Sequence, residues 1–152
     1  MKKTMLISGL SLVVSLAMAI PSYAEVEGIK SSDQILAELK QTVKTISTEE
    51  LKKEIEEDPD LVLVDIRTPT EIANMGGTIQ ATQNVNIVRG WLEFKITGIA
   101  QSKDTPIVVY CGGGLRSPMA ADTLMKMGYT NVKDYNEGFL GWKKAGLPIS
   151  KK

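Results

Sequence analysis

The sequence predicts an α/β fold in which helices cover both faces of a central, mostly parallel sheet. Residues 61–64 and 106–110 form two short apolar runs, which are too brief for helices and typical of strands buried on both faces. Helical patterns alternate with these runs along the chain, as βαβ units require. The 152 residues are 43% hydrophobic and 24% charged, which is the balance of one ordinary folded domain.

The first 24 residues are expected to be a signal peptide. Lys2 and Lys3 precede an apolar run of about 16 residues, which is shorter than the roughly 20 needed to span a bilayer. The small residues Ser22 and Ala24 suit signal peptidase, so cleavage is expected before Glu25. We therefore expect a periplasmic or secreted protein with no membrane anchor after cleavage. An uncleaved anchor is the alternative.

The next segment, 25–46, is expected to be a helical extension that precedes the main domain, 47–152. Ile35 and Leu39 repeat at helical spacing within a predicted helix over 33–44. That helix either packs on the domain or offers a surface to a partner, and the sequence leaves both interpretations open.

Helices and strands then alternate through the main domain. Ser47 and Glu50 form a capping box that opens a helix, and Pro59 follows its end. The later elements are expected in this order: a short helix over 70–75, a short strand over 84–87, a helix from Gly90, a helix over 117–127 with Ser117 as its N-cap and Pro118 at its first position, a strand over 132–135 and a helix over 139–145.

The chain contains no histidine, and this narrows the chemistry that it can perform. A Ser-His-Asp triad, a Cys-His dyad and a His-ligated metal site are all excluded. Cys111 is the only cysteine, so there is neither an internal disulfide nor a CxxC pair. The 18 basic and 18 acidic residues give a net charge of zero, which argues against a nucleic-acid partner. No metal or organic cofactor is expected.

The segment from Tyr110 to Ser117 is the strongest candidate for a functional site. Ligands of open α/β sheets bind beyond the carboxyl ends of strands, which is where Cys111 is expected. The glycines that follow it, Gly112, Gly113 and Gly114, allow backbone N–H groups to point inward as an anion nest. The helix start and Arg116 add positive charge, so the thiol should ionise without a general base. The alternative is that Cys111 is a small buried hydrophobe beside a plain turn.

The spacing of this loop argues against a phosphate ligand. Four residues separate Cys111 from Arg116, whereas protein phosphatases of the cysteine type have five. The loop is therefore one residue too short to wrap a phosphate comfortably.

Four segments together resemble the rhodanese family of sulfurtransferases. Residues 111–117 match every fixed position of its Cys-x-x-Gly-x-Arg-Ser loop. The other three are residues 64–71, which contain an Asp-x-Arg segment, residues 84–94, and residues 136–148 with their closing Gly-Leu-Pro. The resemblance covers residues 47–149. One departure is that residues 78–82 read Thr-Ile-Gln-Ala-Thr where the family usually has His-Ile-x-Gly-Ala.

The resemblance implies that Cys111 carries a persulfide between a small sulfur-donor anion, such as thiosulfate, and a thiophilic acceptor, either cyanide or a thiol. Residues 112–117 would then bind the substrate: Gly112, Gly113, Gly114, Leu115 and Ser117 as the loop, and Arg116 as the group that orients the donor. A protein acceptor is also conceivable and is not identified. The alternatives are a persulfide carrier with slow turnover and a non-catalytic domain that binds anions or proteins.

Other polar and aromatic residues receive structural interpretations. Asp65 and Arg67, together with Glu71, are expected to brace the loops through hydrogen bonds and an ion pair. Trp91 and Trp142 are expected to pack in the core or at the rim of the site.

Overall fold

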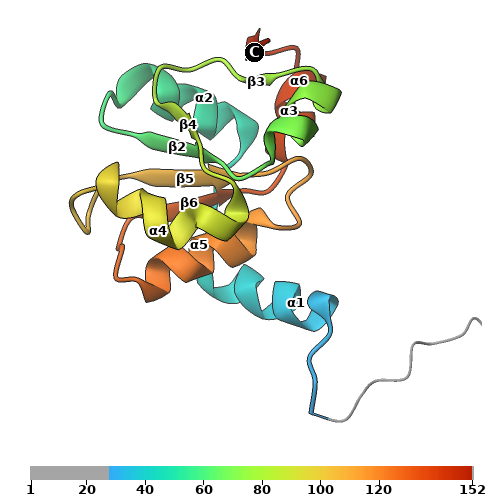
Figure 1. Ribbon diagram of the computed structural model, residues 1–152, viewed down its shortest axis with the longest axis vertical. Coiled ribbons are helices and arrows are strands. Elements are labelled where there is room, and N and C mark those ends of the chain that lie inside the picture. The colour runs from blue at the N-terminus through green and yellow to red at the C-terminus, as the bar shows by residue number, and fades with distance from the viewer. Residues whose placement is uncertain (1–27, 152) are drawn as a thin grey trace, which may run out of the picture.

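A computed structural model describes residues 28–151, and its architecture is the α/β fold that the sequence predicts (Figure 1). Five parallel strands form the central sheet in the order β1-β6-β5-β2-β4. In this order they are β1 (Lys44–Thr45), β6 (Val132–Tyr135), β5 (Ile107–Tyr110), β2 (Val62–Asp65) and β4 (Asn84–Asn86). The predicted signal peptide, residues 1–24, lies outside the described residues.

Helices cover both faces of this sheet, as Figure 1 shows. One face carries α1 (Ser32–Thr42), α4 (Leu92–Lys95) and α5 (Ser117–Lys126), and the other carries α2 (Thr48–Glu57), α3 (Pro69–Met75) and α6 (Gly138–Lys144). Short 3-10 segments, η1 (Arg89–Trp91) and η2 (Ile96–Gly98), flank α4. A small antiparallel pair, β3 (Thr78–Ile79) and β7 (Ile149–Ser150), lies apart from the main sheet.

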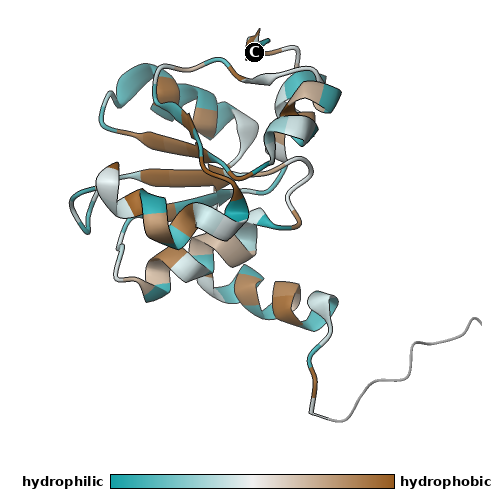
Figure 2. Ribbon diagram, in the orientation of Figure 1, coloured by the Kyte–Doolittle hydropathy of each residue, from teal (hydrophilic) through white to brown (hydrophobic). Residues whose placement is uncertain are grey.

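The apolar runs in the sequence become the two central strands. Every residue of β2 and β5 is buried. Because successive side chains on a strand point to opposite faces, Val62 and Val64 join the core beside α5, whereas Leu63 joins the core beside α2 and α6. Figure 2 shows the hydrophobic strands between helices that carry both hydrophobic and hydrophilic residues. Continuous apolar runs are therefore explained by burial on both faces.

Local capping fixes where three helices begin. Ser31, Ser47 and Thr68 each accept a hydrogen bond from the third helical residue, whose side chain reaches back to the cap. At the other end of α3, Gly76 adopts a φ of 92°, the left-handed conformation that ends a helix. The capping box predicted at Ser47 is thus confirmed.

The start of α5 differs from the prediction. Arg116, with φ −97° and ψ −26°, occupies the N-cap position and makes no side-chain capping bond. Ser117 is instead the first helical residue, so the prediction of Ser117 as N-cap is wrong. The physical reason is that its buried hydroxyl faces the Cys111 sulfur, 3.8 Å away, rather than an N–H group of α5.

Helix α1 and strand β1 pack on the rest of the protein. Leu39 and Val43 are buried in the same core as α5, which α1 contacts directly. Strand β1 was not predicted from the sequence, and it pairs with β6 as an edge of the main sheet. Of the two interpretations left open for the helix at 33–44, packing on the domain is the one that the structure shows.

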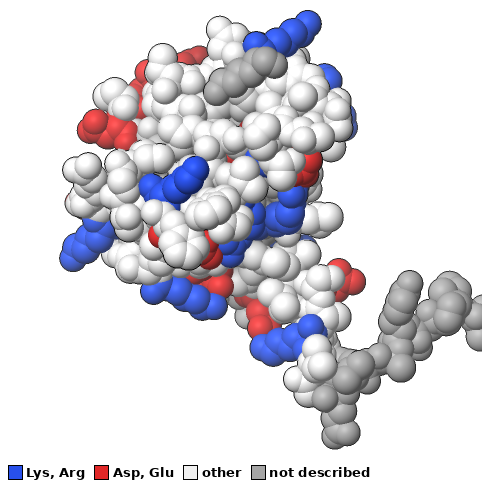
Figure 3. All heavy atoms as spheres, viewed as in Figure 1, with Lys and Arg blue, Asp and Glu red and all other residues white. Residues whose placement is uncertain are grey.

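The described surface has mixed charge. Figure 3 shows basic and acidic side chains interspersed on one face, with neither sign covering a broad area. Among residues 28–151, no helix is both long and apolar enough to cross a membrane.

Candidate active site

The candidate nucleophile lies where strand β5 ends. The loop that follows carries Cys111 to the carboxyl edge of the parallel sheet, and α5 begins six residues later at Ser117. The whole Cys111 residue is only 1% exposed, so the sulfur lies at the bottom of the loop. Its Sγ accepts a hydrogen bond from the Gly114 N–H at 3.2 Å. This is the position that the sequence predicts for a reactive thiol.

The loop favours the ionised form of this thiol. Burial raises the pKa of Cys111, but the backbone N–H groups of Arg116, Ser117 and Gly114, together with the Ser117 hydroxyl, outweigh burial and lower the pKa below its ordinary value. Hydrogen bonds to a charged acceptor are stronger than those to a neutral one, so donors that converge on one sulfur select the thiolate. The site therefore holds an anion largely with main-chain groups.

The shape of the loop depends on two close backbone approaches. Gly114 has a φ of 78°, and a Cβ there would lie 1.7 Å from the Asn136 carbonyl oxygen. At Gly138, with φ 60°, a Cβ would lie 2.7 Å from the Cys111 carbonyl oxygen. Only glycine fits at either position. By contrast, a Cβ on Gly113 would make an ordinary contact of 3.9 Å.

Helix α6 holds the loop from the opposite side. The N–H of Phe139 donates to the Cys111 carbonyl at 2.8 Å, and that of Leu140 donates to the Gly112 carbonyl at 2.9 Å. The first N–H groups of a helix lack partners within that helix, and here they bind the loop. These bonds turn the carbonyl groups of Cys111 and Gly112 toward α6.

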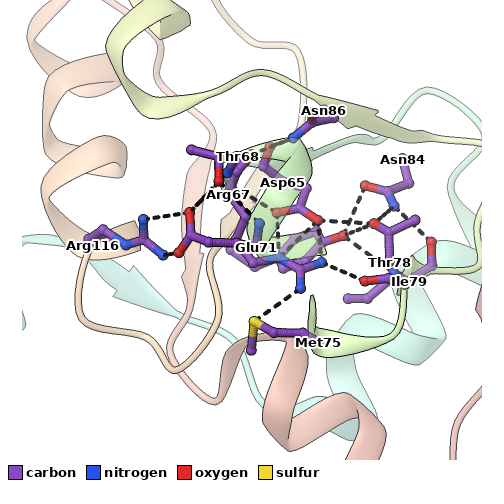
Figure 4. Close-up of polar contacts among 12 residues, drawn as sticks. Asp65, Arg67, Thr68, Glu71, Met75, Thr78, Ile79, Asn84, Asn86 and Arg116 are labelled. Carbon is purple, nitrogen blue, oxygen red and sulfur yellow. Dashed lines mark hydrogen bonds and ion pairs between the residues drawn. The ribbon is translucent and has the colours of Figure 1, made fainter. Parts of the chain in front are cut away.

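The arginine of the loop is paired with a carboxylate, as Figure 4 shows. Arg116 Nη2 lies 2.5 Å from Glu71 Oε1, and Nη1 lies 3.2 Å from Oε2. This bond to Arg116 is the main reason that the pKa of Glu71 falls to about 2. Glu71 also completes the capping box of α3 with Thr68. The side chain of Arg116 remains 44% exposed, so the guanidinium is open to solvent at the rim.

The expectation that Glu71 joins Asp65 and Arg67 is wrong. As the third residue of α3, Glu71 turns its carboxylate back toward the helix cap at the surface, where Arg116 meets it. Arg67 is fully buried and lies on the inner side of the same segment. The two arginines therefore have separate carboxylate partners.

Asp65 and Arg67 form a fully buried ion pair at the end of β2 (Figure 4). Arg67 Nη2 lies 2.6 Å from Asp65 Oδ2 and also donates to the Gly77 carbonyl at 3.0 Å. Its guanidinium stacks on the Phe139 ring, 4.2 Å from the ring centroid. The structure therefore places this pair as a brace between α3, α6 and β2.

Thr78 occupies the position at which the family usually has a histidine, and its hydroxyl forms several polar contacts. Its hydroxyl donates to Asp65 Oδ2 at 3.0 Å and lies 2.7 Å from the Tyr110 hydroxyl. Asn84 Nδ2 donates to Thr78 Oγ1 at 2.8 Å. Residues 78–79 form β3, so the segment is ordered despite this departure, and the Thr78 hydroxyl is hydrogen-bonded.

The two tryptophans have different environments. Trp142 is buried, and its indole N–H donates to the Pro148 carbonyl at 2.8 Å. Trp91 is 58% exposed and meets the exposed Phe94 edge to face. Trp142 therefore packs in the core, as expected, whereas Trp91 lies on the surface.

Sequence reasoning did not single out Asp134, which the structure buries beside the loop. Asp134 is 2% exposed, and its Oδ1 has no hydrogen-bond partner. Its only sequence signal is an acidic residue inside the predicted strand over 132–135. Within residues 28–151, no group of three or more histidine, cysteine or acidic side chains could hold a metal ion.

Comparison with known proteins identifies the class to which this fold and loop belong. The chain is a member of the rhodanese-like domain family, whose model matches residues 47–145. A sulfurtransferase from Allochromatium vinosum is 37% identical over 110 residues, which cover 70% of this chain and 94% of the relative. A tRNA uridine(34) hydroxylase from Prochlorococcus marinus is 33% identical over 88 residues, which cover 55% of this chain but only 28% of that protein.

Solved structures show the same fold. A protein of unknown function from Rhodopseudomonas palustris, described as a possible tyrosine phosphatase, superposes with a TM-score of 0.73 at 33% identity and covers 87% of this chain and all of its own. The polysulfide-sulfur transferase homodimer of Wolinella succinogenes superposes with a TM-score of 0.67 at 26% identity, covering 79% of this chain and 89% of its own.

The buried ion pair gives a stability prediction. Asp65→Asn keeps the shape of the side chain but leaves the charge of Arg67 without its partner, so the free energy of unfolding should fall by about 3 kcal/mol or more. The matched control is Asp122→Asn, which breaks a pair with the exposed Lys126 and should cost less than about 0.5 kcal/mol. Urea denaturation of both variants measures this. Equal losses of unfolding free energy in the two variants would show that the Asp65–Arg67 pair does not stabilise the fold.

Proposed function

We propose that this protein transfers a sulfane sulfur from thiosulfate or a similar donor to a thiophilic acceptor through a persulfide on Cys111. The observation that carries the proposal is the convergence of backbone N–H groups and the Ser117 hydroxyl on the Cys111 sulfur, where these donors lower the pKa of the thiol and Arg116 adds a nearby positive charge. Membership of the rhodanese-like family and the sulfurtransferase relative support the same chemistry.

The reaction has two nucleophilic steps. In the first, the Cys111 thiolate attacks the outer sulfur of thiosulfate. A new S–S bond forms, the S–S bond of thiosulfate breaks, and sulfite leaves with the electron pair. In the second, cyanide or a thiolate attacks the outer sulfur of the persulfide, and the Cys111 thiolate leaves. No proton transfer to a histidine is required, which agrees with a chain that has none.

The loop N–H groups have the same role in both steps. They stabilise the thiolate that attacks and the thiolate that is released, and the persulfide anion between the two steps places its charge near the same donors. Arg116 is placed to orient the anionic donor at the rim, because its guanidinium is partly exposed next to the loop. Glu71 holds that guanidinium and offsets part of its charge.

Other reactions receive less support from this loop. Four residues lie between Cys111 and Arg116, one fewer than in cysteine phosphatases, which disfavours a phosphatase. The match to a tRNA hydroxylase concerns 28% of that longer protein. A persulfide carrier with slow turnover uses the same Cys111 chemistry, and turnover with cyanide separates it from the proposed enzyme.

We also propose that the protein works outside the cytoplasm. The support is the positive, apolar and small-residue pattern of residues 1–24. N-terminal sequencing of the exported protein should begin at Glu25.

Cys111→Ser tests the proposal most simply. Serine is nearly isosteric but cannot carry a persulfide, so sulfur transfer should be abolished while the fold is retained. Wild-type protein mixed with thiosulfate should gain about 32 Da, the mass of one sulfur atom, and the serine variant should gain none. Mass spectrometry and a thiocyanate assay measure the two results. Retained turnover in the serine variant would eliminate Cys111 as the nucleophile.

A pair of glycine variants tests the role of the loop backbone. Gly114→Ala must shift the loop away from Asn136, so the Gly114 N–H should lose its bond to the sulfur. Loss of a hydrogen bond to a charged group costs about 1.5–3 kcal/mol, so kcat/KM with thiosulfate should fall at least about tenfold. Gly113→Ala, which has room for its methyl group, should stay within about threefold of wild type. Equal effects of the two changes would contradict this role.

Variants of Arg116 and Glu71 should change the use of thiosulfate in opposite directions. Arg116→Ala removes the rim cation, so kcat/KM with thiosulfate should fall about ten- to a hundredfold. Arg116→Lys should fall less, because it keeps the charge but not the planar fork. Glu71→Gln keeps the cap of α3 and removes the competing carboxylate, so KM for thiosulfate should fall. Steady-state kinetics measure all three. An unchanged KM in Glu71→Gln would show that this pair does not limit donor binding.

A further inference from the structure

A cavity of about 390 Å³ lies between α1 and the active-site loop. Leu36 of α1 and Val43, the residue that caps the end of α1, form one apolar wall, and Leu115 and Pro118 form the opposite one. The volume falls within the range of about 300–1,000 Å³ that is typical of sites for small molecules. Helix α1 lies outside residues 47–145, the part that matches the rhodanese-like family, and seven of the twelve residues that line the cavity precede that match.

Asp134 is a buried acidic residue in the lining of this cavity. It lines the cavity from β6, and its carboxylate is buried with Oδ1 unpartnered. Burial raises the pKa of Asp134 to about 6, and the nearby Ser117 hydroxyl opposes that rise. The carboxylate is therefore mostly ionised at neutral pH. Oδ1 of this buried carboxylate has no hydrogen-bond partner, which is costly when the group is ionised, and a cation that also donates hydrogen bonds offsets that cost best.

The charges at the cavity agree with a cationic ligand. Three charged residues line it: Asp134 from β6, and Asp33 and Lys40 from α1. Two acidic groups and one basic group leave a net charge of −1 when all three are ionised. The remaining walls are largely apolar, so they suit the hydrocarbon part of such a ligand. The one competing cation of the lining is Lys40, which a variant can remove.

We propose that this cavity binds small primary amines in their ammonium form, with the ammonium group at Asp134 and a short apolar body between α1 and the loop. This site goes beyond the proposed sulfur transfer and does not depend on it. Gly114 lines the cavity and also donates its N–H to the Cys111 sulfur, so a ligand in the cavity lies next to a residue that binds the reactive sulfur.

Amide NMR spectra of the ¹⁵N-labelled protein test the proposal, with isobutylammonium as the probe and isobutanol as its uncharged counterpart. Isobutylammonium should cause saturable shifts at the amides of Gly114, Leu115 and α1, and isobutanol should bind at least about tenfold more weakly. Asp134→Asn keeps the shape of the side chain and should weaken isobutylammonium binding at least about tenfold. Asp122→Asn removes a carboxylate that pairs with Lys126 and does not line the cavity, so it should leave binding unchanged.

Three results would overturn the proposal. One is the absence of saturable shifts with isobutylammonium. Another is equal binding by wild type and Asp134→Asn, provided that the remaining amide signals of the variant overlay those of wild type. The third is binding that appears only in Lys40→Gln, which would show that Lys40 itself occupies the site. Each result concerns binding alone, so it is distinguishable from a failure of sulfur transfer.

Discussion

The buried ion pair between Asp65 and Arg67 is the interaction on which the rest of the site depends. Two opposite charges with no exposed surface persist only where their geometry and additional hydrogen bonds compensate for lost hydration. Arg67 meets this condition through the Gly77 carbonyl and the Phe139 ring, and Asp65 through Thr78. One pair thereby fixes the end of β2, the exit from α3 and the first turn of α6.

The position of α6 then determines the active-site loop. Phe139 stacks on Arg67 through its ring and binds the Cys111 carbonyl through its N–H group. Gly138 permits this approach, and Gly114 permits the loop to close against Asn136. With its carbonyl groups held by α6, the loop directs N–H groups at the sulfur. A chain without histidine can therefore ionise its nucleophile by means of backbone geometry.

The features that the sequence predicts are those encoded locally. Apolar runs predict β2 and β5, the Ser47–Glu50 spacing predicts the start of α2, and the glycines with Arg116 predict an anion nest after Cys111. The features that it misses depend on contacts between distant segments. Glu71 pairs with Arg116 across 45 positions, and β1 is a two-residue strand defined only by β6. The burial of Asp134 and the lack of a hydrogen-bond partner for its Oδ1 likewise depend on the folded environment of β6 and cannot be inferred from the sequence.

A pH titration of the thiolate absorbance of Cys111, with the Cys111→Ser variant as the blank, tests the central claim most directly. As the only cysteine, Cys111 gives the whole signal. If the N–H groups of the loop outweigh burial, the thiolate should form with a pKa clearly below the free-thiol value of about 8.5. Ser117→Ala should retain part of that shift, because the main-chain donors remain. A pKa at or above about 8.5 in the wild-type protein would contradict the claim that backbone geometry ionises the nucleophile.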